Sequence, residues 1–121
     1  MQPISILLAD DDATVRQCLR RVVEADPSFQ IRWEAENGLQ ALALAQQHQP
    51  VVALIDAQMP RMDGIEATRC LRQHYPDLRI LVLSVYDQAR AQALAAGADA
   101  FLTKDCGCEV IRGTIRRLVN L

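Results

Sequence analysis

The chain has 121 residues, of which 50% are hydrophobic and 23% are charged, and its formal net charge at pH 7 is -2. This length and mixture predict one folded domain and exclude a disordered or collagen-like chain. The near-neutral charge gives no reason to expect direct nucleic-acid binding, and the apolar runs are shorter than the roughly 18 residues of a membrane helix. The first residues do not resemble a signal peptide, so we expect no membrane association and a cytoplasmic location.

Short apolar runs alternate along the chain with longer stretches of helical periodicity. Proline precedes most of the apolar runs, where it ends one unit and suits the extended start of the next. In chain order we expect a strand at 4–9, a helix with its apolar face over 15–23, a half-exposed strand at 29–33, a helix at 38–48, a buried strand at 51–55, a helix at 65–74, a buried strand at 80–83, an alanine-rich helix at 87–96, a strand at 98–102 and a helix over 111–118. Five such units predict an α/β fold, a five-stranded parallel sheet with helices on both faces.

Polar side chains follow the predicted strands at the edge where open parallel sheets bind ligands. Asp10 and Asp11 follow the first strand, Asp56 the third, Ser84 the fourth and Lys104 the fifth. Carboxylates held close together repel one another and attract a hard cation such as Mg²⁺. An ammonium and a hydroxyl suit phosphate oxygens, and a carboxylate can accept a phosphoryl group. The combination predicts metal-assisted phosphoryl transfer to an aspartate.

Each of these residues also has an ordinary structural interpretation. The three aspartates at 10–12 can cap the following helix, and for Asp12 we favour that role. Asp56 can begin a turn, Lys104 can be a solvated lysine, and a serine at a strand end is uninformative. Only the combination of these residues indicates a site.

Four longer motifs cover most of the chain: LLADDDATVR at 7–16, ALIDAQMPRMDGIEATRCLR at 53–72, ILVLSVYD at 80–87 and GADAFLTKD at 97–105. Through these motifs the chain resembles, over essentially its whole length, the receiver domain of two-component response regulators, most closely those with a LuxR-type helix-turn-helix output domain. This resemblance implies a flavodoxin-like, doubly wound fold with strand order 2-1-3-4-5.

The resemblance also implies roles for individual residues. Asp56 would be the phosphoacceptor, with Lys104 binding the phosphate. Ser84 and Phe101 would form the switch, in which Ser84 moves towards the phosphate and Phe101 fills the space left behind. Gln58 and Tyr86 fall at two positions that tune autodephosphorylation. The implied ligands of a Mg²⁺ or Mn²⁺ ion are Asp10, Asp11, Asp56 and the main-chain carbonyl of Gln58.

The implied function is a phosphorylation-dependent signalling switch rather than an enzyme, with at most self-catalysed phosphorylation and dephosphorylation. Its partner would be a sensor histidine kinase or a phosphotransfer protein. We expect residues 1–121 to be one receiver domain. It is either a stand-alone receiver or a part of a longer regulator; we favour the second, with a DNA-binding output domain outside this chain. We also expect the face built from residues 87–119 to mediate homodimer formation or contact with the output domain.

Three other functions are compatible with part of the pattern. Asp10-x-Asp12-x-Thr14 matches the nucleophile motif of haloacid-dehalogenase-type hydrolases, but that interpretation leaves Asp56 and its MPRMDG tail unexplained. A flavin or nucleotide binder needs a phosphate-cradling first loop, whereas this loop is acidic. A receiver-like interaction module that takes no phosphate would not need the complete set of site residues.

The cysteines do not form the framework of a small secreted protein. Without a secretory signal we expect reduced thiols at Cys18, Cys70, Cys106 and Cys108. The Cys106-Gly107-Cys108 segment could bind metal or act as a redox pair, but a lone C-x-C lacks a second ligand pair.

Overall fold

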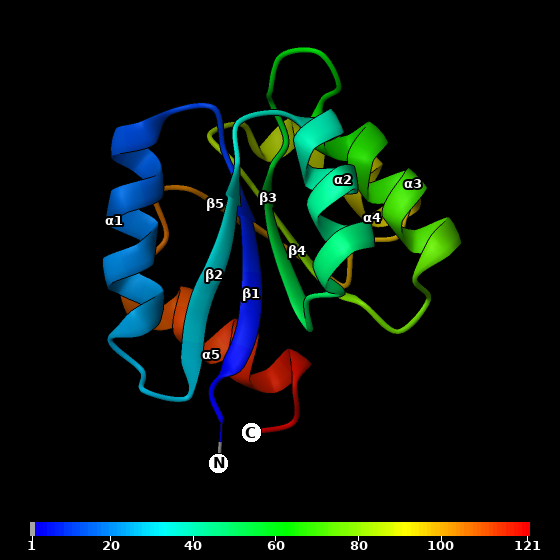
Figure 1. Ribbon diagram of the computed structural model, residues 1–121. Helices are drawn as coiled ribbons and strands as arrows, with labels where there is room; N and C mark the ends of the chain where they lie inside the picture. The colour runs from blue at the N-terminus through cyan, green and yellow to red at the C-terminus, as the bar shows by residue number, and fades with distance from the viewer. Residues whose placement is uncertain (1) are drawn as a thin grey trace.

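Five parallel strands form the centre of the molecule in the order β2-β1-β3-β4-β5 (Figure 1). The computed structural model describes residues 2–121. The strands are β1 (Ile4–Ala9), β2 (Phe29–Ala35), β3 (Val52–Asp56), β4 (Arg79–Ser84) and β5 (Ala100–Thr103). The helices are α1 (Ala13–Glu24), α2 (Gly38–His48), α3 (Gly64–His74), α4 (Arg90–Ala96) and α5 (Cys108–Leu118), and a 3-10 turn, η1 (Asp87–Ala89), precedes α4. The predicted fold class and strand order are confirmed.

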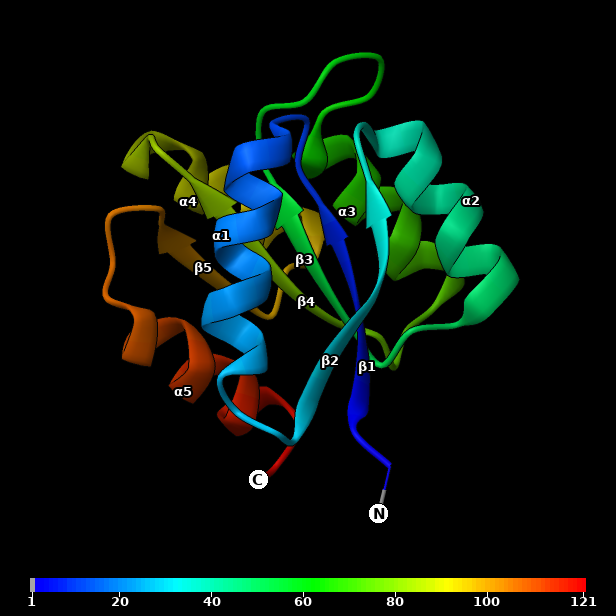
Figure 2. The ribbon, with the colours of Figure 1, turned by 60° about the vertical axis from the view of Figure 1, so that its left-hand side comes forward.

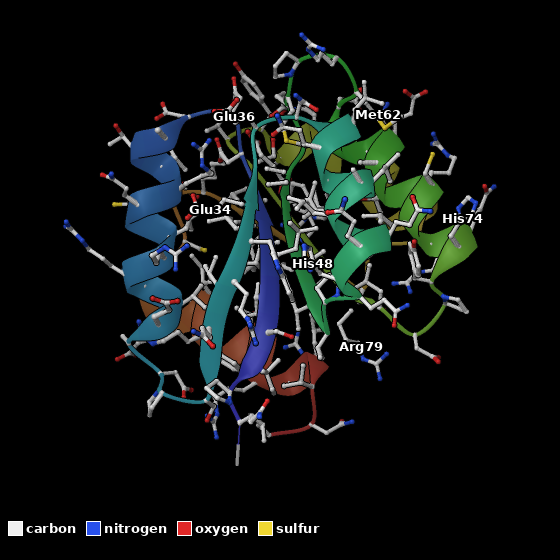
Figure 3. The ribbon with its side chains drawn as sticks, in the orientation of Figure 1. Glu34, Glu36, His48, Met62, His74 and Arg79 are labelled. Atoms are coloured by element: carbon white, nitrogen blue, oxygen red, sulfur yellow. The ribbon has the colours of Figure 1, made fainter. Side chains whose placement is uncertain are left out.

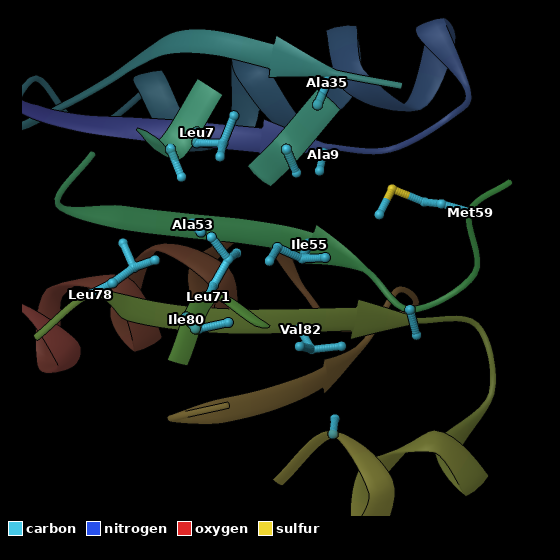
Figure 4. Packing of buried hydrophobic residues seen from close by; sticks show 14 of the residues in the cluster. Leu7, Ala9, Ala35, Ala53, Ile55, Met59, Leu71, Leu78, Ile80 and Val82 are labelled. Carbon is cyan, nitrogen blue, oxygen red and sulfur yellow. The ribbon is translucent and has the colours of Figure 1, made fainter. Parts of the chain in front are cut away.

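Helices cover both faces of the sheet and bury its alternating side chains. Helices α1 and α5 lie on one face, and α2, α3 and α4 lie on the other (Figures 1 and 2). Because successive side chains of a strand point to opposite faces, Ile6 and Leu8 enter the core under α1 and α5,. Leu7 and Ala9 enter the core under α2, α3 and α4, where Leu71 from α3 packs against the sheet (Figure 4). Both cores together hold the carboxyl ends of the strands in fixed positions.

Some element ends differ from the prediction because tertiary packing, not local pattern, sets them. The prediction of Val51 as a buried strand residue is wrong: it is 45% exposed, and β3 begins one residue later. The expected helix at 87–96 is divided into η1 and α4. The last strand begins at Ala100 rather than at 98, because Gly97 adopts the left-handed conformation and Ala98 still donates to the carbonyl of Ala93,.

Side-chain caps begin the helices on either side of the site. The side chain of Asp12 accepts hydrogen bonds from the backbone of Thr14 and Val15, so its predicted capping role is confirmed. Asp63 caps α3 in the same way through the backbone of Glu66. Within residues 2–121, no helix has the length and apolar character needed to cross a membrane.

Candidate functional site

Three aspartates meet at the carboxyl edge of the sheet. Strand β1 pairs with β3, so Asp10 and Asp56 leave neighbouring strands at the same edge. One carboxylate oxygen from each of Asp10, Asp11 and Asp56 lies within 4.8 Å of the other two, and they form the one such acidic group found in the described part of the chain. Asp10 and Asp56 are 1% and 6% exposed, whereas Asp11 is open to solvent. The structure therefore brings the predicted acidic residues together.

The ammonium of Lys104 joins two of these carboxylates. Its Nζ lies 2.8 Å from Oδ2 of Asp10 and 3.2 Å from Oδ2 of Asp56. Burial acts against the charged form of Lys104, but the hydrogen bond to Asp10 and the charge of Asp56 outweigh it and raise the pKa of Lys104. Burial, with a contribution from the charge of Asp10, also raises the pKa of Asp56, although Lys104 acts in the opposite direction. Lys104 thus stays charged next to a carboxylate that is costly to ionise.

The donor set fits a divalent cation. Three carboxylates and one ammonium leave two negative charges in a largely buried site, where close like charges repel strongly. All the available oxygens are hard ligands of the kind that Mg²⁺ and Mn²⁺ prefer. Gln58 lies in the loop after β3, and its backbone N–H donates to Oδ1 of Asp56 over 3.3 Å. Its main-chain carbonyl stays a predicted ligand.

Ser84 lies at the end of β4, next to the strand that carries Asp56. Its hydroxyl is buried and donates a hydrogen bond of 2.9 Å to Oε1 of Gln58. The backbone N–H of Tyr86 donates to the same hydroxyl over 3.0 Å. The side chain of Gln58 therefore has a structural role that the sequence did not reveal.

Phe101 lies in the core beneath the start of α4. It is 4% exposed, and its ring belongs to the cluster that includes Val82 and Ala93. The guanidinium of Arg90 lies over the ring at 4.8 Å from its centre. The ring is therefore already in a buried orientation in this structure.

Two glycines fix the loop between β3 and α3. A Cβ on Gly64 would lie 1.9 Å from the carbonyl oxygen of Asp56, and a Cβ on Gly38 would lie 2.3 Å from the carbonyl oxygen of Met62. The backbone N–H of Gly38 also donates to that Met62 oxygen over 3.0 Å. Figure 3 shows Met62 beside the start of α2. Sequence reasoning missed Gly38, although a glycine at the first position of a helix is a usable signal, since other residues suit that position better.

Arg72 connects the end of α3 to the turn that follows α4. Its guanidinium donates to the carbonyls of Gly97 and Leu78 and to the carboxylate of Asp99. Asp99 in turn accepts from the backbone N–H of Ile80 at the start of β4. No pattern in the sequence distinguishes Arg72 from the surface arginines around it.

Comparison with known proteins places these features in a family. Residues 6–116 match the response regulator receiver domain. The chain is 34% identical over 110 residues to the transcriptional regulatory protein DegU of Brevibacillus brevis, covering 89% of this chain and 47% of that protein. It is 41% identical over 110 residues to a protein-glutamate methylesterase/protein-glutamine glutaminase of Myxococcus xanthus, covering 88% of this chain and 31% of that protein.

A solved structure agrees with this assignment over the full fold. The signal receiver domain of the putative response regulator NarL from Mycobacterium tuberculosis superposes with a TM-score of 0.93 at 30% identity, covering 99% of this chain and 98% of that one. The chain spans about half or less of the two curated relatives named above. The matched segment includes the three aspartates of the acidic site and Lys104. The chain therefore belongs to the response regulator receiver domain family of two-component signalling.

Proposed function

We propose that this domain is a switch that accepts a phosphoryl group on Asp56 from a histidine kinase or phosphotransfer protein, with Mg²⁺ or Mn²⁺ bound at Asp10, Asp11, Asp56 and the carbonyl of Gln58. One observation supports it above the others. The carboxylates of Asp10, Asp11 and Asp56 converge within 4.8 Å. The ammonium of Lys104 reaches two of them, as a site for phosphate oxygens needs.

The proposed reaction is a displacement at phosphorus. An oxygen of the Asp56 carboxylate attacks the phosphorus of a phosphohistidine; a P–O bond forms, the P–N bond breaks, and the imidazole leaves with the electron pair. A bound divalent ion would add positive charge opposite the phosphoryl oxygens and relieve the repulsion among the carboxylates. Lys104, whose ammonium is 3.2 Å from Asp56, would release that carboxylate and bind a phosphoryl oxygen instead,.

The proposed relay starts at the hydroxyl of Ser84. To donate to a phosphoryl oxygen, this hydroxyl must give up the hydrogen bond to Gln58. Phe101 and Arg90 would then rearrange at the start of α4 and change the face built from residues 87–119. That face exposes Leu94 and Val110, which are 45% and 47% exposed, so it can bury apolar surface against a second copy or an output domain,. Phosphorylation would shift an existing equilibrium between two states.

We further propose that the output is a DNA-binding domain outside residues 1–121. A relative that this chain matches over part of its length is named as a transcriptional regulatory protein. The receiver itself has a net charge of -2, which does not favour contact with nucleic acid,. Another relative is named as a methylesterase, but the chain covers 31% of that protein, so we assign no enzymatic activity beyond self-catalysed phosphorylation and dephosphorylation.

Labelling with acetyl phosphate and Mg²⁺ tests the proposed acceptor. Asp56→Asn should abolish incorporation, and so should removal of the ion by a chelator. Asp12→Asn is the matched control: the amide still caps α1, so labelling should persist. In a haloacid-dehalogenase-type enzyme, Asp10 would carry the phosphate and Asp12 would be needed for turnover. Labelling that survives Asp56→Asn would therefore overturn the proposal, and phosphate mapped to Asp10 would favour that hydrolase.

A further inference from the structure

Three cysteines line one apolar groove between α1 and α5, away from the proposed phosphoacceptor. Cys18 comes from α1, Cys106 from the turn after β5, and Cys108 from the first residue of α5. Their thiols are free, and the proposed phosphoryl chemistry uses none of them. Lys104 also lines this groove. The thiols are therefore close in sequence and space to a residue that the switch depends on.

Two of these cysteines are separated by a single residue and line the same groove. Gly107, which separates Cys106 from Cys108, has φ -69° and ψ 156°, an extended conformation. Cys108 is exposed and Cys106 half-buried. Burial first, then the charge of Asp105 and a smaller contribution from Cys108, raises the pKa of Cys106, so Cys108 is the thiol that meets an oxidant more readily,.

The intervening glycine leaves room for the two sulfurs to join. Two extended residues span about 6.6 Å, near the upper end of the roughly 4.4–6.8 Å between Cα atoms that a disulfide requires. A Cβ on Gly107 would meet no atom within 4 Å, so the space on that side of the turn is open. Glycine also has the widest choice of backbone conformations. Contraction of the turn to disulfide geometry would therefore act on its backbone hydrogen bonds rather than on packed side chains at Gly107.

We propose that Cys106 and Cys108 form a reversible disulfide when the domain meets a peroxide. The thiolate of Cys108 attacks one oxygen of hydrogen peroxide, and the O–O bond breaks to give a sulfenic acid and hydroxide. The sulfur of Cys106 then attacks the sulfur of Cys108, the S–O bond breaks, and hydroxide leaves. With the two thiol protons counted, two thiols and one peroxide give one disulfide and two waters. A dithiol reverses the step by exchange.

The disulfide would act on the backbone that carries Lys104. The N–H of Lys104 donates to the carbonyl of Ser84 over 2.8 Å, and the N–H of Cys106 donates to the carbonyl of Thr103 over 3.1 Å. The carbonyl of Gly107 accepts from the N–H of Val110 over 3.0 Å at the start of α5. Contraction between residues 106 and 108 pulls on both ends of this turn. Oxidation should therefore loosen the first turn of α5 and shift Lys104.

Peptide mass mapping of the whole chain after peroxide treatment tests the bond. Trypsin cuts after Lys104 and Arg112, so both cysteines fall in the single peptide 105–112. After the remaining thiols are blocked, this peptide should carry no blocking group and should be two hydrogens lighter than the reduced, unblocked peptide. After treatment with dithiothreitol, both cysteines should react with the blocking reagent. Cys18→Ser and Cys70→Ser should keep the bond, whereas Cys106→Ser and Cys108→Ser should lose it. Free thiols throughout, a bond to Cys18, a bond between chains, or singly over-oxidised cysteines would each overturn the proposal.

Amide exchange and labelling test the effect on Lys104. Exchange over residues 104–111 should be faster in oxidised wild type than in the same protein after dithiothreitol, and Cys108→Ser should show no change with peroxide. Identical exchange in both forms would overturn the coupling to Lys104. The link to phosphorylation rests on the proposed function, and oxidised wild type should be labelled more slowly by acetyl phosphate. If even the reduced protein takes no label, the proposed function fails, while the mass and exchange results still decide the disulfide.

Discussion

The hydroxyl of Ser84 is held by the side chain of Gln58 through a hydrogen bond of 2.9 Å. A hydroxyl has one proton to donate, so Ser84 cannot bind a phosphoryl oxygen on Asp56 while this bond exists. The backbone N–H of Tyr86 donates to the same oxygen and keeps it in place. In the proposed switch, Gln58 would thus stabilise the unphosphorylated arrangement.

Replacing Gln58 by Leu should make activation easier. Loss of a neutral hydrogen bond is worth about 1 kcal/mol, so the affinity for beryllofluoride, a phosphoryl mimic, should rise roughly 5-fold. Gln88 lines the same groove as Gln58, and Gln88→Leu serves as the control, with no change expected. Titration followed by the backbone resonance of Ser84 measures both. An unchanged or weaker affinity in Gln58→Leu would contradict the role of this hydrogen bond.

Magnesium affinity should respond in opposite directions to changes at Asp11 and Lys104. Loss of even an outer-shell partner weakens metal binding roughly 10- to 100-fold, so Asp11→Ala should lower the affinity at least that much. Lys104→Met should raise it roughly 3- to 10-fold, because the ammonium repels the ion and occupies carboxylate oxygens of Asp10 and Asp56,. Calorimetric titration measures both, with Asp12→Asn as a control that should match wild type. Equal affinity in wild type and Asp11→Ala would argue against Asp11 as a ligand.

Stability should depend on pH through Asp56. Burial and the charge of Asp10 raise its pKa in the folded state, so the folded domain holds this proton more tightly than the unfolded chain. The contribution of Asp56 to stability is therefore fully present below its pKa in the unfolded chain. It is lost as the pH rises through the higher pKa of the folded state. At pH 7 the free energy of unfolding of Asp56→Asn, measured by urea titration, should exceed that of wild type by about 1 kcal/mol. This difference should shrink as the pH falls. A difference that grows in acid would have the wrong sign.

The close approach of α2 to the loop after β3 should make Gly38 intolerant of a side chain. Alanine normally favours a helix over glycine by about 1 kcal/mol. At Gly38, however, a Cβ would meet the carbonyl of Met62, so Gly38→Ala should destabilise the domain by about 1–2 kcal/mol,. Gly113 in α5 has no atom within 4 Å of its Cβ position, so Gly113→Ala should stabilise by about 0.5–1 kcal/mol,. Similar urea midpoints for the two variants would contradict this packing.

The order of the strands and helices was predictable because a parallel sheet covered on both faces needs short, fully apolar runs. Strand ends were less predictable: Val51 is as apolar as its neighbours, yet it precedes the first residue of β3 and is 45% exposed. The position of Asp56 and Lys104 at strand ends was also predictable from the pattern. The ion pairs of Lys104 with Asp10 and Asp56 depend on the conformation of the lysine side chain in the folded domain. Local sequence does not encode that conformation.

The contacts that position the switch were the least visible in the sequence. Gln58 and Ser84 are 26 residues apart, and their hydrogen bond arises only when the loop after β3 meets the end of β4. Arg72 and Asp99 pair over 27 residues in the same way. Close packing at glycines is easier to predict from the sequence. Gly38 and Gly64 lie at helix starts, where other residues have better intrinsic propensity,.

Chemical trapping of the phosphorylated residue tests the central claim most directly. Borohydride reduces an acyl phosphate to an alcohol, which converts a phosphorylated aspartate to homoserine and marks it in a peptide map. After incubation with acetyl phosphate and Mg²⁺, we predict homoserine at position 56, dependent on the metal, and aspartate unchanged at positions 10, 11 and 12. Homoserine at position 10, or no homoserine in a protein that has taken up phosphate, would contradict Asp56 as the phosphoacceptor.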